Sequence, residues 1–140
     1  DVAKPGSATR QLAETVDLYP TLAELAGLPK PKGPQPIDGV SLVPVLKNPK
    51  ARVRDHAFHA YPRRKLGRAI RTERYRLVEW KNHAKPDEAA EYELYDYRSD
   101  PNETQNHVAT RPKVVAQLKA ILAKHPKPVN RSRRPAGKKK

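Results

Sequence analysis

The chain has 140 residues, of which 29 are Lys or Arg and 15 are Asp or Glu, and its formal net charge is +14 at pH 7. It contains 36% hydrophobic residues, 6% aromatic residues and 15 prolines. This composition suffices for one modest hydrophobic core and excludes a large multidomain protein. It has no Cys, which excludes disulfides, thiolate nucleophiles and Cys-based zinc sites. No stretch approaches the roughly 18 consecutive apolar residues of a membrane helix. Because the first residue is Asp1, we expect a processed chain or an excised fragment.

The positive charge is concentrated in two segments. Residues 50–76 contain ten basic and two acidic side chains, and residues 124–140 contain eight basic side chains and no acidic one. The proline-containing end of the chain cannot bury enough apolar surface to fold. We therefore predict that residues 126–140 form a disordered basic tail with nonspecific affinity for polyanions.

The first predicted element is a short helix over residues 17–26. Its apolar residues recur at helical spacing and share one face: Leu18, Leu22, Leu25 and Ala26. Asp17 is its expected N-cap, and Gly27 supplies a left-handed stop at its C-terminus. An extended, proline-rich connector is expected at residues 29–36, and the apolar run at residues 38–46 is expected to add one helical turn.

Four short strands are predicted next, because short runs rich in aromatic or β-branched residues are bounded by turn residues. They cover residues 55–61, 68–72, 75–80 and about 91–95. In the third strand, alternation sends Tyr75 and Leu77 to one face and Arg76, Val78 and Trp80 to the other. The segment at residues 72–74 is short enough to be a hairpin turn.

An amphipathic helix is predicted over residues 111–124, with Thr110 as its expected cap and Pro112 in its first turn. One stripe carries its apolar residues: Val114, Leu118, Ile121 and Leu122. The fold class predicted from residue 50 onward is therefore α+β, with a small antiparallel sheet of about four strands and this helix packed on one face.

The first third of the chain does not fit into that α+β unit, since its helix offers an apolar face with no strand of its own nearby. We therefore expect residues 1–49 to be the C-terminal end of a preceding domain, residues 50–125 to be a C-terminal subdomain, and residues 126–140 to be the tail.

The residues by themselves predict no catalytic centre and no metal site. A strand would put His56 and His59 on opposite faces, which is poor geometry for shared metal ligation. The acidic side chains at residues 87–93 are more simply a solvated surface than a paired-carboxylate acid/base site. The sequence has no Gly-rich phosphate loop and no Ser nucleophile elbow.

A basic loop at residues 61–68 is the remaining candidate for a binding site. It contains four cations between two predicted strands: Arg63, Arg64, Lys65 and Arg68. The planar fork of Arg matches carboxylate or sulfate oxygens. A run of charges is also a common solvated face, so both interpretations stay open at this point.

Three stretches resemble, in this order, landmarks of the C-terminal third of type I sulfatases. They are VDLYPTLAELAGL at residues 16–28, DGVSLVPVL at residues 38–46, and ELYD with SDPNETQN between residues 93 and 106. Within that family, residues 57–63 and 67–80 resemble the iduronate-2-sulfatase branch. The resemblance covers about residues 10–123.

The resemblance implies an enzyme similar in fold to alkaline phosphatase, in which a large α/β domain carries the chemistry and a small C-terminal domain packs against it. In the family, a formylglycine made from Cys or Ser in a Cys/Ser-x-Pro-x-Arg motif attacks sulfur, and a calcium ion polarises the sulfate. This chain has no such motif, so no catalytic residue, metal ligand or cofactor is assigned to it. The resemblance also suggests an extracytoplasmic location.

The resemblance further implies that residues of this region border the sugar pocket. Arg63 matches a Tyr-Pro-Arg of the branch, and Lys65 lies where the branch carries a basic residue that meets a uronate carboxylate. His59 is the third candidate for contact with an anionic substrate.

The resulting hypothesis is that the chain is the C-terminal part of a sulfatase acting on sulfated sugars and is inactive alone. Its expected partners are the upstream catalytic domain or chain and a sulfated sugar, with no membrane and no specific nucleic acid. The alternative is a noncatalytic basic module that binds nucleic acid or sulfated polysaccharide. Aromatic residues are not interleaved with the basic loop, as stacking on nucleic acid would require.

Overall fold

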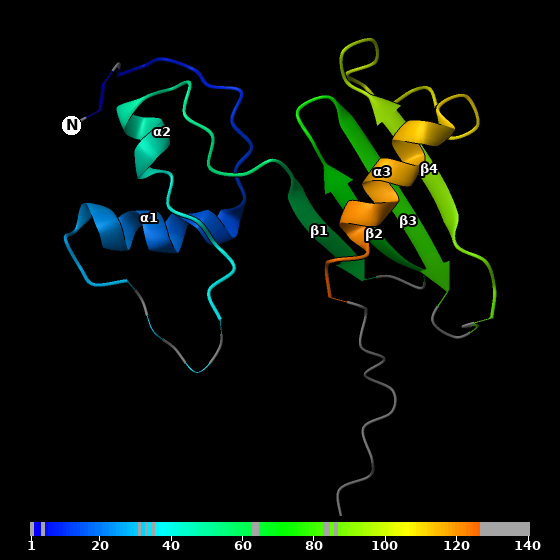
Figure 1. The fold of residues 1–140 in the computed structure, drawn as a ribbon, viewed down its shortest axis with the longest axis horizontal. Helices are drawn as coiled ribbons and strands as arrows, with labels where there is room; N and C mark the ends of the chain where they lie inside the picture. Colours follow the sequence, from blue (N-terminus) through cyan, green and yellow to red (C-terminus); the bar gives the residue numbers. More distant parts are fainter. Residues whose placement is uncertain are drawn as a thin grey trace, which may run out of the picture. The chain divides into compact units, whose positions relative to one another are not determined.

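The computed structural model describes the chain except residues 1, 4, 31, 33, 35, 63, 64, 83, 84, 86 and 127–140. The chain divides into two compact units (Figure 1). The first unit comprises Asp1–Ala57 with Arg71–Arg74, and the second comprises Phe58–Ile70 with Tyr75–Lys140. Among the described residues, no helix combines the length and the apolar character needed to cross a membrane. The predicted tail from residue 127 onward lies outside the described residues.

The first unit contains a 3-10 turn at Thr15–Asp17, helix α1 at Leu18–Leu25 and helix α2 at Val43–Lys47. Gly27 ends α1 as predicted, with a left-handed φ of 68°. In that conformation the Gly27 N–H donates to the carbonyl of Glu24 at 3.1 Å, and the Leu28 N–H donates to the carbonyl of Ala23 at 2.9 Å.

Asp17 occupies the N-cap position of α1 as predicted, but its carboxylate makes no capping hydrogen bond to that helix. Instead, Asp17 accepts hydrogen bonds from the backbone N–H of Glu14 at 2.7 Å and of Val40 at 2.9 Å. One helical turn later, the Thr21 hydroxyl donates to the Asp17 carbonyl at 2.6 Å and accepts from the Leu42 N–H at 2.9 Å. These two side chains tie the DGVSL segment to α1.

The predicted apolar face of α1 is exposed. Leu18, Leu22 and Leu25 are 55%, 63% and 57% exposed, whereas the buried residues of the helix are Thr21 and Ala23. The reason is that the side of α1 bearing Thr21 is the side held against the DGVSL segment.

The second unit is built on a four-stranded antiparallel sheet with strand order β1-β2-β3-β4. The strands are β1 at Ala57–Pro62, β2 at Lys65–Arg71, β3 at Tyr75–Asn82 and β4 at Glu91–Asp96. In the β3 and β4 pair, Leu77 lies opposite Leu94 and Trp80 lies opposite Glu91. The predicted α+β class and its four strands are confirmed.

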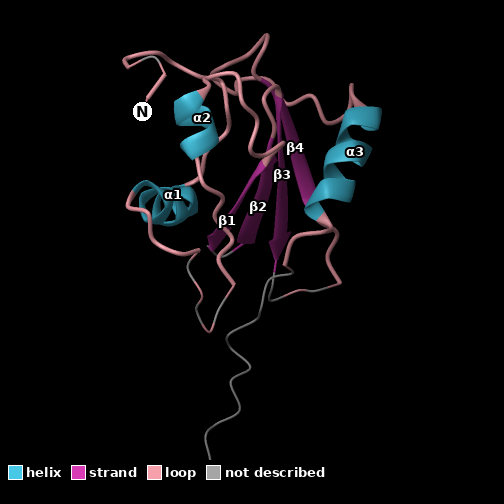
Figure 2. Cartoon of the chain, turned by 60° about the vertical axis from the view of Figure 1, so that its left-hand side comes forward, coloured by secondary structure: helices cyan, strands magenta, loops and turns pink. Residues whose placement is uncertain are grey.

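Helix α3 at Pro112–Leu122 covers one face of this sheet (Figures 1 and 2). The hydrophobic core lies between them: Ile70, Leu77 and Leu94 from the strands and Leu118 and Leu122 from the helix. The N-cap of α3 is Arg111 and not the predicted Thr110, whose hydroxyl instead donates to the carbonyl of His107 at 3.2 Å.

The SDPNETQN segment after β4 is held by its own polar side chains. Asp100 accepts a hydrogen bond from the Gln105 N–H at 2.8 Å. Asn106 accepts from the N–H groups of Leu94 and Val108, each at 3.0 Å, and so fastens the segment to β4. Glu103 has a left-handed φ of 57°. The residues that carry this landmark therefore have a structural role.

Candidate functional site

Of the three predicted substrate-contacting residues, Arg63 lies outside the described residues, and so does Arg64. Lys65 begins β2, and its Nζ lies 2.6 Å from Glu91 Oε1. Both side chains of this ion pair are exposed, at 45% and 68%. The hydrogen bond to Glu91 raises the pKa of Lys65, so Lys65 is a charged group at the surface and accessible to a ligand.

Within the basic run at residues 61–68, Lys65 lies in β2 and not in a loop, whereas Arg68 lies in a strand as predicted. Arg68 is only 11% exposed, and its Nε donates to Glu79 Oε1 at 2.9 Å. The Tyr92 hydroxyl donates to the other Glu79 oxygen at 2.8 Å. Burial, followed by the hydrogen bond to Glu79, raises the pKa of Tyr92 to about 12. Arg68 is therefore part of a structural network.

His59 lies on β1 and lines a cavity of about 290 Å³. The other lining residues are Tyr61, Gly67, Ala69, Arg76, Val78 and Trp80. The residues of β3 that line it alternate with Tyr75 and Leu77, which contact the core under α3. The cavity is therefore on the sheet face opposite α3, and the predicted alternation of β3 is confirmed. Burial, followed by the positive charge of Arg76, lowers the pKa of His59, so its imidazole is neutral at pH 7.

Trp80 lies flat over Gly67 in this cavity. A Cβ added to Gly67 would be 2.6 Å from Trp80 Cζ3 and 3.0 Å from both Cε3 and Cη2. The distances to these two flanking ring atoms exceed the distance to Cζ3 by only 0.4 Å, which places that Cβ above the ring face, because a Cβ beyond the ring edge would be much farther from the flanking atoms. Only a glycine lets the indole ring adopt this position.

Arg76 is the charged group of the same cavity. Its Nη1 donates to Glu103, at 2.6 Å from Oε1, and the Tyr97 hydroxyl donates to the same carboxylate. Its Nε is buried and has no hydrogen-bond partner among the described residues. Arg76 therefore combines a fixed position with an unused buried donor.

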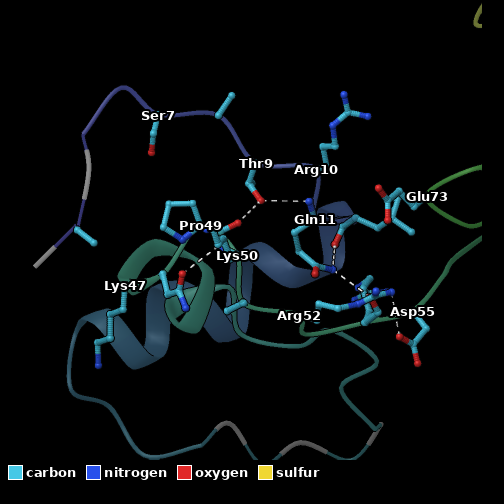
Figure 3. A pocket seen from close by; sticks show the side chains of 16 residues that line it. Ser7, Thr9, Arg10, Gln11, Lys47, Pro49, Lys50, Arg52, Asp55 and Glu73 are labelled. Atoms are coloured by element: carbon cyan, nitrogen blue, oxygen red, sulfur yellow. Dashed lines mark hydrogen bonds and ion pairs between the residues drawn. The ribbon is translucent and has the colours of Figure 1, made fainter. Parts of the chain in front are cut away.

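A larger cavity of about 660 Å³ lies in the first unit, between residues 3–12 and residues 47–55 (Figure 3). Thr9 donates to the carbonyl of Pro49 at 2.7 Å, and Gln11 Nε2 donates to the carbonyl of Arg54 at 3.1 Å, which holds the two walls together. Five basic side chains line it: Arg10, Lys47, Lys50, Arg52 and Arg54. Sequence reasoning missed this cavity, because segments about 40 residues apart form it and neither contains a recognisable motif.

The described residues contain no group of three or more His, Asp or Glu side chains that could hold a metal ion. The calcium ion that the resemblance implies therefore has no fitting ligand set in the described part of this chain, and no chemical step is assigned to a metal here. The cavity on the sheet face opposite α3 instead offers an aromatic, a cationic and a hydrogen-bonding side chain suited to ligand binding: Trp80, Arg76 and His59.

Comparison with known proteins gives consistent results. A family model described as N-sulphoglucosamine sulphohydrolase, C-terminal, matches residues 1–128. The chain is 31% identical to an N-acetylglucosamine-6-O-sulfatase of Bacteroides thetaiotaomicron, over 74% of this chain and 19% of that protein. It is 30% identical to an ulvan-active sulfatase of Formosa agariphila, over 79% of this chain and 27% of that protein. The chain thus spans only about a fifth to a quarter of these curated relatives.

A solved structure shares the fold. A protein crystallised with its substrate D-glucosamine-2-N,6-O-disulfate has a TM-score of 0.62 and 28% sequence identity, over 76% of this chain and 22% of that chain. The likeness extends to the four-stranded antiparallel sheet with its helices.

Proposed function

The chain belongs to the family of sulfatase C-terminal domains, since the family model covers residues 1–128, and we propose that it is the C-terminal part of a sulfuric ester hydrolase that acts on sulfated sugars. The relatives support the substrate class, because their names specify a 6-sulfated amino sugar in one case and ulvan in the other. In this proposal the reaction belongs to the complete enzyme, and this chain supplies structural support and part of the substrate pocket.

The observation that carries the proposal is the exposed apolar face of α1. Leu18, Leu22 and Leu25 are each more than half exposed on one side of a helix whose other side is tied to residues 40–42. Burial of apolar surface is the main driving force for association. This face would pack against an upstream α/β catalytic domain, carried on the same polypeptide or on a separate chain.

The catalytic groups would come from that upstream part. The sequence of this chain has no Cys and no Ser-x-Pro-x-Arg motif from which a formylglycine is made. Calcium would be held there as well, where it would polarise the sulfate ester. We therefore expect this chain alone to have no sulfatase activity.

The iduronate-2-sulfatase-like branch is the finer proposal. Lys65, a charged group at the surface, would meet a uronate carboxylate, and Arg63 would lie near it in the chain. His59, neutral because of its lowered pKa, would donate or accept a hydrogen bond with a sugar hydroxyl.

The proposal is tested by assaying two proteins with an aryl sulfate and with sulfated disaccharides in the presence of calcium. One is this chain, and the other is its full-length parent made in cells that convert the catalytic Cys or Ser to formylglycine. We expect turnover from the parent and none from the chain. A parent inactive on every sulfate ester would overturn the sulfatase assignment, and turnover by the chain alone would overturn the division of roles.

A further inference from the structure

We propose that the cavity on the sheet face opposite α3 binds one sugar ring that carries a carboxylate or sulfate, with the ring stacked on Trp80 and the anionic group bound by Arg76. The proposal rests on the proposed function for the choice of sugars as ligand. The site itself follows from the geometry of residues on β1, β2 and β3.

Trp80 has the geometry of a stacking platform. One face of its six-membered ring lies over the Gly67 backbone, so the ring is parallel to the sheet and its opposite face is turned away from Gly67. An indole combines a large apolar face with a polar N–H, and the C–H groups on one side of a pyranose ring form a matching apolar surface. Such a ring needs a flat aromatic face, and the absence of a Cβ on Gly67 leaves room for the indole in this position.

Arg76 supplies the anionic recognition. Its guanidinium is held through Nη1 by Glu103, while its Nε is buried without a partner among the described residues. Arg76 is the positively charged side chain among the residues that line the cavity. A guanidinium is a planar group whose N–H donors match the oxygens of a carboxylate or sulfate. Its charge and its place in the lining therefore favour a ligand of this chemistry.

The size and polarity of the cavity narrow the ligand further. A volume of about 290 Å³ is at the lower end for ligand sites and suits a single sugar ring rather than an oligosaccharide. His59 lines the same cavity as a second polar group and would contact a ring hydroxyl. Inorganic sulfate has neither an apolar face nor hydroxyls, so it should bind far more weakly than an acidic sugar.

The single Trp of the chain makes the test direct, since all tryptophan fluorescence comes from Trp80. The whole chain is titrated with D-glucuronate, D-glucose 6-sulfate, D-glucose and sodium sulfate. We expect a saturable fluorescence change with the two acidic sugars and an affinity for glucose lower by about tenfold or more. The absence of saturation with both acidic sugars, or equal affinity for glucose, would overturn the proposal.

Three variants sharpen the test. Gly67→Ala should weaken acidic-sugar binding by about tenfold or more, because the added Cβ displaces the indole. His59→Ala gives a second disruption of the cavity if Gly67→Ala does not fold, as judged by circular dichroism. Lys119→Ala, a change under the opposite sheet face beside Tyr92, should bind as the wild type does. Wild-type affinity in a folded Gly67→Ala protein and in His59→Ala would refute the site.

The two proposals fail separately. A flat titration together with sulfatase activity of the full-length parent would refute this sugar site and leave the proposed function intact. Saturable binding of acidic sugars together with a parent that cleaves no sulfate ester would refute the proposed function and support the sugar site.

Discussion

Asp17 and Arg54 form an ion pair in the interior of the first unit, although they are 37 positions apart in the chain. The Asp17 side chain is fully buried and that of Arg54 is 12% exposed. A second Arg54 nitrogen binds Glu14, and burial lowers the pKa of Arg54. With its two backbone partners, Asp17 links α1, the DGVSL segment and the residues just before β1. The stability of the first unit therefore depends on this carboxylate.

Replacing Asp17 with Ala should lower the free energy of unfolding by roughly 3–5 kcal/mol, because it leaves the buried Arg54 charge without this partner. Urea unfolding followed by circular dichroism measures the loss. Asp55→Ala is the matched control, since the Asp55 and Arg52 side chains are 88% and 67% exposed. It should change the free energy of unfolding by less than about 0.5 kcal/mol. Equal effects of the two substitutions would contradict the role assigned to Asp17.

The role of Asp17 also marks what the sequence alone predicts. Elements governed by local pattern were predictable, such as β3, whose alternation places Leu77 in the core and Trp80 on the opposite face. The partners of polar side chains were not predictable, because they depend on residues distant in the chain. Asp is a residue type that favours helix N-caps, and Asp17 stands at that position. Its carboxylate nevertheless binds the Val40 N–H and Arg54 and not the first N–H groups of α1.

The same reason explains the candidate site. Arg68 belongs to the basic run for which an anion-binding and a solvated interpretation were both open, yet its partner Glu79 is on the neighbouring strand and holds it in the fold. The position of Trp80 over Gly67 could not be predicted either, because the two residues lie on different strands and the sequence does not show that they meet. The resemblance to sulfatases, carried by short motifs, predicted the family that the comparison supports.

The network around Glu79 predicts a specific loss of stability in acid. Burial would raise the pKa of Glu79, but the hydrogen bonds from Arg68 and Tyr92 outweigh it, so the folded-state pKa lies below the ordinary value of 4.5. The network therefore stabilises the fold fully above pH 4.5, and this contribution is lost as the pH falls through the lower folded-state pKa.

Unfolding measured at neutral pH and at several values below 4.5 tests this, with Glu79→Gln as the comparison. The stability advantage of the wild type over Glu79→Gln should shrink as the pH falls. An advantage that stays constant across this range would show that the charge of Glu79 is not what stabilises the network.

Gly39 and Gly27 should respond differently to the same substitution. A Cβ on Gly39 would lie 2.0 Å from the carbonyl oxygen of Val16, a backbone atom that cannot move without displacing the turn before α1. Gly39→Ala should therefore destabilise by about 2 kcal/mol or more. A Cβ on Gly27 meets nothing within 4 Å, so Gly27→Ala should cost only the strain of its left-handed backbone, about 1 kcal/mol. Thermal unfolding of both variants measures the order, and the reverse order would contradict it.

The exposed face of α1 gives a prediction that separates folding from association. The double change Leu22→Gln and Leu25→Gln should alter the stability of this chain by less than about 0.5 kcal/mol per site, since both side chains are already solvated. In the full-length parent the same change should lower both the melting temperature and the sulfatase activity. Lys30→Gln, an exposed charge after the helix, is the control expected to change neither. A parent unaffected by the double change would show that this face does not contact the catalytic domain.

The pair of Lys65 and Glu91 yields the prediction closest to the substrate. If Lys65 binds a uronate carboxylate, that carboxylate must replace Glu91, whose oxygen lies 2.6 Å from Nζ in the free chain. Lys65→Gln in the full-length parent should then raise KM for a uronate-containing substrate by about tenfold and leave kcat nearly unchanged. Glu91→Gln should lower KM, because it removes the competing anion. Since both side chains are largely exposed, neither change should lower the melting temperature measurably.

Steady-state kinetics with a substrate lacking the carboxylate provides the control, for which both variants should match the wild type. If Lys65→Gln raised KM equally for both substrates, Lys65 would contribute general electrostatic attraction and not recognition of the carboxylate.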